Sequence, residues 1–391
     1  MGVQAQAVTS SGRSGRITRP IVSMDASGDD PMIARRGRGA VTNPPNRFED
    51  TSTSAFDDGW GTLPSALLDL PALQTEFIRD ATRSVISYNS SPDLGFDRSV
   101  NVYRGCEHGC VYCYARPTHA YLGYSPGLDF ETKLLYKPEA AQMLERELRR
   151  QKYVAKPIVL GANTDPYQPI DRTLKLTRSV LEVLDRFNHP AIIVTKSASV
   201  LRDLDILQSM ARRNLLQVYI SVTTLDPALA RRMEPRAAAP GRRIAAIGEL
   251  SRGGVPVAVL AAPMIPGLND SELEAILRAA ANAGATHAGY GLLRLPLELA
   301  QMFEDWLGLH YPDRARRVLH LIRETRAGAL NDSAFGQRFS GVGAYAEMLR
   351  LRFDKTARQL GLAPRGELDS AGFAVPRQTE SACGASQMTL L

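Results

Sequence analysis

From Ser99 onward, the chain alternates short runs rich in Val and Ile with longer segments of helical period. This alternation is the pattern of successive βα units, in which parallel strands are joined by helices. Strands are predicted over residues 100–103, 158–162, 191–195, 217–223, 255–262 and 287–293. Helices with an apolar stripe are predicted over residues 138–151, 174–188, 199–213, 241–252 and 271–283.

Six βα units are too few to close an eight-stranded barrel, and parallel strands need cover on both faces. The pattern therefore predicts an α/β fold, either a partial (β/α)6 TIM-like barrel or a doubly wound sheet. In both architectures ligands bind at the C-terminal ends of the strands. Residues that follow a strand are consequently the first candidates for a functional site.

The predicted core covers residues 99–296, and the flanking segments differ from it in composition. Residues 1–58 are rich in Ser, Gly, Arg, Asp and Pro without hydrophobic periodicity, so we expect a disordered, basic N-terminal segment. Within it, residues 36–49 are either a strap laid over the folded domain or a flexible linker. Residues 59–98 form a lead-in, and residues 297–391 a helical C-terminal extension with a flexible tail.

Charge and hydropathy restrict the cellular compartment and the binding partners that we expect for this chain. The formal net charge is +6, which suits an anionic partner such as nucleic acid, although many of the arginines lie in the N-terminal segment. The longest apolar stretch, residues 255–268, is interrupted by Pro263 and Pro266. We therefore expect a cytoplasmic protein that does not enter a membrane.

Three of the four cysteines fall within eight positions, directly after the first predicted strand. Cys106, Cys110 and Cys113 have the spacing C-x3-C-x2-C, and the fourth cysteine, Cys383, stands alone in the tail. Such an arrangement indicates metal or redox chemistry in place of a disulfide scaffold. Three thiolates on one loop can hold three irons of a 4Fe-4S cluster and leave the fourth iron open. The alternative is a zinc site completed by His108 or His119.

The cysteine spacing, with an aromatic residue before the last cysteine, resembles the radical S-adenosylmethionine (SAM) superfamily. This resemblance implies a partial six-unit barrel, a 4Fe-4S cluster on Cys106, Cys110 and Cys113, and S-adenosylmethionine as the ligand of the fourth iron. It also implies that the reduced cluster cleaves S-adenosylmethionine to a 5'-deoxyadenosyl radical, which abstracts hydrogen from a substrate. An electron donor such as flavodoxin or ferredoxin is then a required partner.

Polar residues at three strand ends are the candidate contacts for S-adenosylmethionine, which presents an ammonium and a carboxylate. An Asx turn at Asp165 and a helix cap beside Lys196 are the structural alternatives. Ser221 and Thr223 share one strand face. The candidate residues are Tyr112, Asn163, Thr164, Asp165, Lys196, Ser221 and Thr223.

These segments are most similar to the spore photoproduct lyase branch of the superfamily, and the chain as a whole resembles an uncharacterised subfamily. That lyase carries a hydrogen-donating cysteine at the end of its second strand, where this chain has Asn163. The resemblance therefore does not extend to photoproduct repair by that mechanism. The Gly-rich segment 331–347 is either a cover over the barrel mouth, with Arg338 facing an anion, or a loop that leads into a helix.

The sequence thus predicts a radical SAM enzyme whose substrate is not identified, with nucleic acid as one candidate. No residue is assigned to the chemistry performed on the substrate. The alternative function is a non-catalytic protein in which a metal stabilises a nucleic-acid-binding fold.

Overall fold

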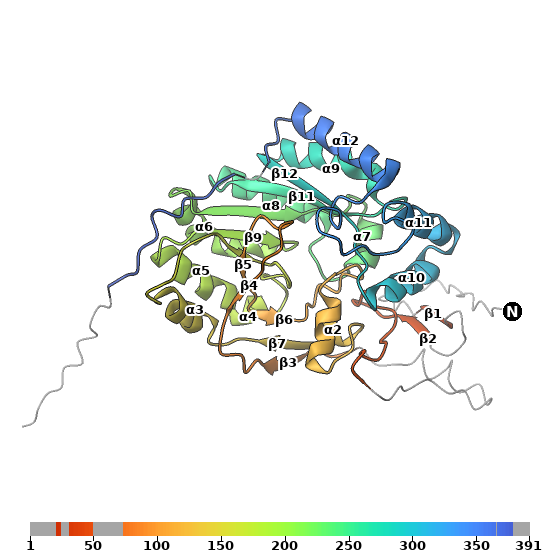
Figure 1. Cartoon of the computed structure of the whole chain (residues 1–391), viewed down its shortest axis with the longest axis horizontal. Coiled ribbons are helices and arrows are strands. Elements are labelled where there is room, and N and C mark those ends of the chain that lie inside the picture. Colours follow the sequence, from red (N-terminus) through yellow and green to blue (C-terminus); the bar gives the residue numbers. More distant parts are fainter. Residues whose placement is uncertain (1–20, 25–30, 50–72, 365, 378–391) are drawn as a thin grey trace, which may run out of the picture.

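The computed structural model describes residues 21–24, 31–49, 73–364 and 366–377 (Figure 1). Its main sheet has seven strands in the order β12-β11-β10-β9-β8-β5-β4. Every neighbouring pair from β5 to β12 is parallel, and β4 is an antiparallel edge strand on β5. The strands are β4 (Ile86–Tyr88), β5 (Arg98–Val100), β8 (Ile158–Leu160), β9 (Ala191–Thr195), β10 (Leu216–Ser221), β11 (Val257–Met264) and β12 (His287–Leu292).

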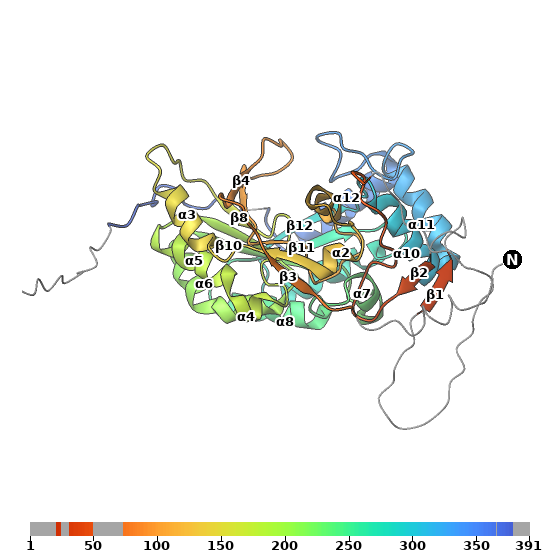
Figure 2. The same ribbon diagram turned by 90° about the horizontal axis from the view of Figure 1, so that it is seen from below.

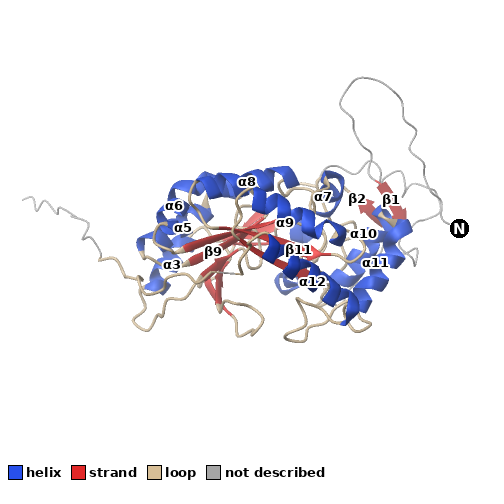
Figure 3. Cartoon of the chain, turned by 90° about the horizontal axis from the view of Figure 1, so that it is seen from above, coloured by secondary structure: helices blue, strands red, loops and turns tan. Residues whose placement is uncertain are grey.

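Helices follow the parallel strands and cover one face of the sheet, as α5, α6 and α8 do in Figure 3. In α5, Val180 and Leu184 are fully buried, because an i, i+4 pair lies on one helix face. The main helices are α3 (Ala140–Leu148), α5 (Leu176–Arg186), α6 (Leu204–Ala211), α8 (Pro240–Arg252) and α9 (Leu273–Asn282). Shorter ones are α4 (Asp171–Leu174), η2 (Ala198–Asp203), α7 (Pro227–Met233) and η3 (Asp270–Glu272).

The predicted α/β fold is confirmed, with six parallel strands arranged as a partial barrel. Strand β9 has the predicted bounds, and the other predicted strands and helices shift by a few residues. The first predicted strand is the exception, because it is divided between two sheets. Val100 ends β5 in the main sheet, whereas Tyr103 begins β6 (Tyr103–Arg104), which belongs to a second sheet.

This second sheet has three strands in the order β3-β7-β6, and the sequence did not predict it. It contains β3 (Glu76–Arg79) and β7 (Lys133–Tyr136), with η1 (Arg116–Leu122) and α2 (Asp129–Thr132) between β6 and β7. Because β6 leads directly into Gly105 and Cys106, the small sheet fixes the start of the cysteine loop.

The C-terminal region is helical, as predicted, and consists of α10 (Leu299–His310), α11 (Pro312–Glu324) and α12 (Gly343–Gln359). Trp306 and Phe303 of α10 are fully buried and stack with ring centroids 5.7 Å apart. After α12, the chain pairs with the edge of β12 through Ala363. Residues 366–377, expected to be part of a flexible tail, then run past α6 and α5, where Phe373 packs between Phe187 and His189.

The N-terminal region contributes the hairpin β1 (Ile21–Met24) and β2 (Pro31–Ala34), followed by an extended segment. Met32 and Val41 are buried in the same core cluster as Cys110 and Trp306. The expectation that all of residues 1–58 is disordered is therefore wrong for residues 31–49. Residues 21–24 likewise form a strand, whereas positions 1–20, 25–30 and 50–58 lie outside the described residues, as does Cys383. Among the described residues, no helix is long and apolar enough to cross a membrane.

Candidate active site

The three motif cysteines lie on one loop, residues 105–115, between β6 and η1. Cys106 and Cys110 are each 8% exposed, Cys113 is partly exposed, and none of the three forms a disulfide. The loop winds back on itself, because the Gly109 amide donates to the Cys106 carbonyl and the Cys113 amide to the Cys110 carbonyl. The predicted spacing thus places three free thiols together near the ends of the strands.

Two glycines make this loop possible. Gly105 and Gly109 adopt φ values of 78° and 67°, which side-chain-bearing residues rarely adopt. A Cβ on Gly109 would lie 2.7 Å from a carboxylate oxygen of Glu131, and one on Gly105 would lie 2.9 Å from the Phe130 carbonyl oxygen. Both turns therefore depend on the absence of a side chain.

Residues 36–49 form a strap across the cysteine loop, which is one of the two roles predicted for them. The Gly39 and Ala40 amides donate to the two carboxylate oxygens of Glu131 at 3.0 and 2.8 Å. Arg38 donates to the Glu131 carbonyl at 2.8 Å. A Cβ on Gly39 would lie 1.7 Å from the Gly109 carbonyl oxygen, so the strap touches the loop backbone itself.

Burial raises the pKa of two of the motif thiols, Cys106 and Cys110. It raises the pKa of Cys106 well above its ordinary value, and the charges of Asp165, Cys110 and Cys113 act in the same direction. Burial also raises the pKa of Cys110 to about 12, and the Lys196 ammonium opposes this shift. The three thiols therefore lie within electrostatic range of one another. Three free thiols of this kind fit an iron–sulfur cluster, whose irons bind the thiolate form.

The two histidines that could complete a zinc site have other partners. His108 Nδ1 lies 3.3 Å from Asp165 Oδ2, and His119 Nε2 hydrogen-bonds with the Lys133 carbonyl at 3.0 Å. The His119 ring packs edge-on against Phe130. Within the described residues, no three His, Cys, Asp or Glu side chains are grouped as ligands of a single metal ion.

Thr164 and Asp165, at the end of β8, are engaged within the protein. The Thr164 hydroxyl donates to the Tyr103 carbonyl at 2.9 Å. Asp165 Oδ1 accepts from the Tyr167 amide and the Thr195 hydroxyl, and Oδ2 accepts from the Lys196 amide. The Asx turn, the structural alternative at Asp165, is therefore present, and the same carboxylate joins the ends of β8 and β9.

Lys196 and Asn163 present side chains at the same rim. Both are half-buried, and no described residue forms a hydrogen bond or ion pair with the Lys196 ammonium or the Asn163 side-chain amide. The Lys196 ammonium lies 5.7 Å from the centroid of the Tyr112 ring. Ser197 caps η2 by accepting from the Ser199 amide, so the helix cap that was the structural alternative coexists with an available lysine.

A buried polar network lies beneath Cys110. Tyr112 and Thr223 are joined at 3.2 Å through their hydroxyls, and both donate to Glu234. Glu234 forms an ion pair with Arg243 at 2.5 Å, and both side chains are almost inaccessible to solvent. Ser221 donates to the Ala262 carbonyl at 3.1 Å. The hydroxyls of Tyr112, Ser221 and Thr223 thus already have protein partners.

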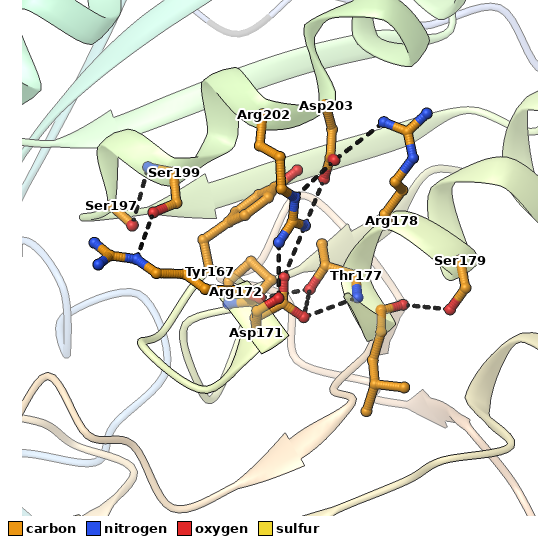
Figure 4. A network of polar contacts seen from close by, with 12 residues as sticks. Tyr167, Asp171, Arg172, Thr177, Arg178, Ser179, Ser197, Ser199, Arg202 and Asp203 are labelled. Carbon is orange, nitrogen blue, oxygen red and sulfur yellow. Dashed lines mark hydrogen bonds and ion pairs between the residues drawn. The ribbon is translucent and has the colours of Figure 1, made fainter. Parts of the chain in front are cut away.

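A second network supports the loop from the side of β8 and is shown in Figure 4. Asp171 accepts from the Tyr103 hydroxyl at 2.7 Å, from the Thr177 amide at 3.1 Å and from Arg202 at 2.8 Å. Because Tyr103 begins β6, the two-residue strand that leads into the loop, Asp171 helps to fix the start of the loop. Sequence reasoning missed a set of buried charges that shape this site: Arg116, Glu131, Asp171, Glu234 and Arg243. Nothing in hydrophobic periodicity marks such residues.

Comparison with known proteins identifies the family. A model of the radical SAM superfamily matches residues 100–280, which include the cysteine loop and β8 to β11. The chain belongs to the radical SAM superfamily. It is also 35% identical over 299 residues to an uncharacterized protein of Mycobacterium tuberculosis, with 76% of this chain and 82% of the relative covered. An uncharacterized protein of Methanocaldococcus jannaschii is 28% identical over 173 residues, which cover 44% of this chain and 62% of that protein.

Solved structures agree on the radical SAM fold. Spore photoproduct lyase complexed with dinucleoside spore photoproduct matches with a TM-score of 0.53 and 15% identity, over 73% of this chain and 80% of the lyase. A mutant of that lyase with bound AdoMet and the same dinucleoside matches with a TM-score of 0.51 and 16% identity, over the same shares. At these identities the likeness shows the partial barrel alone.

Superfamily membership makes the protein a radical SAM enzyme, which needs an iron–sulfur cluster, S-adenosylmethionine, a reductant and a substrate. The alternative of a non-catalytic, metal-stabilised binding protein is thereby set aside.

Proposed function

We propose that Cys106, Cys110 and Cys113 each bind one iron of a 4Fe-4S cluster and leave the fourth iron to S-adenosylmethionine. The grouping of three free thiols on a tightly turned loop carries this proposal. When bound and reduced, the cluster supplies the electron that cleaves S-adenosylmethionine into methionine and a 5'-deoxyadenosyl radical, which abstracts hydrogen from the substrate.

Lys196 and Asn163 are the proposed direct contacts of the methionine moiety. An ammonium without an acidic partner suits the carboxylate of S-adenosylmethionine, and an amide at the neighbouring strand end can accept from its amino group. Thr164, Asp165, Ser221, Thr223 and Tyr112 are proposed to position the strand ends and the loop, because their polar atoms bond within the protein.

The proposed partners are an electron donor such as flavodoxin or ferredoxin and a substrate with an abstractable hydrogen. A basic protein is suited to an anionic substrate, and nucleic acid is the candidate that the sequence indicated.

Anaerobic reconstitution with iron and sulfide, followed by reduction and an assay for 5'-deoxyadenosine, tests the proposal. Wild-type protein should bind about four irons per chain and form 5'-deoxyadenosine. Cys110→Ala should lose both properties. Cys383→Ala, which removes the cysteine outside the motif, should retain both. Zinc in place of iron, or no cleavage by a fully loaded and reduced protein, would contradict the proposal.

A further inference from the structure

The Gly-rich C-terminal segment bridges the two edges of the open main sheet. We name residues 335–342 the clasp. At one edge, the Leu292 amide of β12 donates to the Phe339 carbonyl at 2.9 Å. At the other edge, Arg338 forms an ion pair at 2.6 Å with Asp93, which lies in the turn between β4 and β5. That turn and the loop before α12 project from the same side of the molecule in Figure 2.

The clasp provides one wall around Arg294, which follows β12. The Arg294 guanidinium lies 5.0 Å from the centroid of the Phe339 ring and 5.8 Å from that of Tyr114. Its Nε is buried without a hydrogen-bond partner, and no described residue forms an ion pair with it. A buried donor of this kind destabilises the protein when it is left unsatisfied. Arg294 is therefore placed to meet an acceptor that comes from outside the chain.

The neighbouring charges do not neutralise Arg294. Arg338, which the sequence suggested as the anion-facing residue, already has Asp93 as its partner. Asp93 also accepts from the Gly336 amide at 2.6 Å. Arg326 donates to the carbonyls of Gln337 and Leu293. It therefore adds a positive charge to this region without bringing a carboxylate as its partner. Burial and the charge of Arg338 lower the pKa of Arg294, and the opposing influence of Tyr114 and Asp93 does not cancel this shift.

Arg294 also lies near the site of the chemistry. Tyr114, one of its two aromatic neighbours, immediately follows Cys113, and the Tyr114 hydroxyl donates to the Ala162 carbonyl beside Asn163. A group bound by Arg294 would therefore sit among the cysteine loop, the end of β8 and the end of β12. This is the rim at which ligands of α/β barrels bind.

The surrounding side chains favour one class of anionic substrate. Phe335 on the clasp is 64% exposed, and the Arg338 guanidinium lies 5.1 Å from its ring centroid. Exposed aromatic rings interleaved with arginines are the features on which single-stranded nucleic acids stack their bases and bind their phosphates. An acidic peptide could form ion pairs with the arginines, but it has no bases to stack on the exposed Phe335 ring.

We propose that Arg294 binds a phosphodiester group of a single-stranded nucleic-acid substrate, with Phe335 as a stacking surface for an adjacent base. This inference rests on the proposed radical SAM function and assigns a substrate class to the same site.

Fluorescence anisotropy with labelled 12-nucleotide single-stranded DNA and RNA tests it, using cluster-loaded protein. Arg294→Gln should weaken binding about tenfold or more and reduce the slope of log K against log salt by about 0.7. Phe335→Ala should weaken binding about fivefold or more with little change in that slope. Arg323→Gln removes an arginine whose partner is Glu304 on α10, and should bind as wild type does.

Three results would overturn the inference: no binding of either oligonucleotide by wild-type protein, equal affinity in wild type and Arg294→Gln, or binding of a glutamate-rich peptide in preference to the oligonucleotides. Thermal melts of each variant separate these results from misfolding. Failure of the proposed radical SAM function is measured separately. In that case, wild-type protein assayed without any oligonucleotide forms no 5'-deoxyadenosine.

Discussion

Arg116 and Glu131 form a buried ion pair, with 2.5 Å between Arg116 Nη2 and Glu131 Oε1 and neither side chain exposed to solvent. Arg116 also donates to the Cys110 carbonyl at 2.9 Å, and Glu131 accepts from two amides of the strap. One pair of charges therefore connects the cysteine loop to the strap that covers it.

Glu131→Gln should destabilise the protein by about 3–5 kcal/mol, because it leaves the Arg116 charge buried without its partner. The midpoint of chemical denaturation, measured anaerobically, gives the change. Glu304→Gln removes an exposed ion pair with Arg323 and should cost no more than about 1 kcal/mol. Equal effects of the two substitutions would show that the buried pair does not hold the loop.

Gly39→Ala should displace the strap, since the added Cβ would meet the Gly109 carbonyl oxygen at 1.7 Å. We expect the reconstituted protein to lose iron and sulfide faster in air. The decay of its visible absorbance measures this loss. Gly308→Ala is the matched control, because its Cβ meets nothing within 4 Å and a helical alanine is favoured over glycine. A decay rate equal to that of wild type would argue against the strap as a cover.

Lys196→Met should weaken the binding of S-adenosylmethionine about tenfold to a hundredfold, which is the loss expected for one charge-assisted hydrogen bond. Calorimetric titration of the cluster-loaded protein measures this affinity, and the iron content should stay near that of wild type. Lys156→Met removes an exposed lysine that pairs with Asp97 and should leave the affinity unchanged. Unaltered affinity in Lys196→Met would remove this residue from the cofactor site.

Folding stability should fall as the pH decreases from 6.5 towards 4. Burial lowers the pKa of His189 from 6.5 to about 4, so the unfolded chain binds a proton in this range while the folded protein does not. Stability is then fully present above pH 6.5, and this residue contributes a slope of about 1.4 kcal/mol per pH unit below it. The difference between the denaturation midpoints at pH 5 and pH 7 should be smaller in His189→Phe than in wild type. An unchanged difference would contradict the assignment.

The features predicted from sequence are those that repeat or that have a fixed spacing. Strand β9 and helix α5 were found because apolar side chains recur at the period of the element. The cysteine loop was found because the positions of Cys106, Cys110 and Cys113 are close in sequence as well as in space.

Such patterns do not predict contacts between segments that are distant in sequence. Glu131 and Gly39 are 92 positions apart, and nothing in either neighbourhood indicates the other. Strand β6 has only two residues and leaves no periodic signal. Arg294 differs from the other arginines only in what the fold places around it, so its lack of a partner is a property of the tertiary structure.

The strap meets Glu131 through the backbone amides of Gly39 and Ala40, which almost every residue type carries. At these two positions the contact with Glu131 is therefore made by the main chain, and substitutions along the strap should be tolerated where they spare Arg38, Gly39 and the buried Ala40 and Val41. Relatives with divergent N-terminal sequences can then retain the same shield around the loop, which sequence comparison alone would overlook.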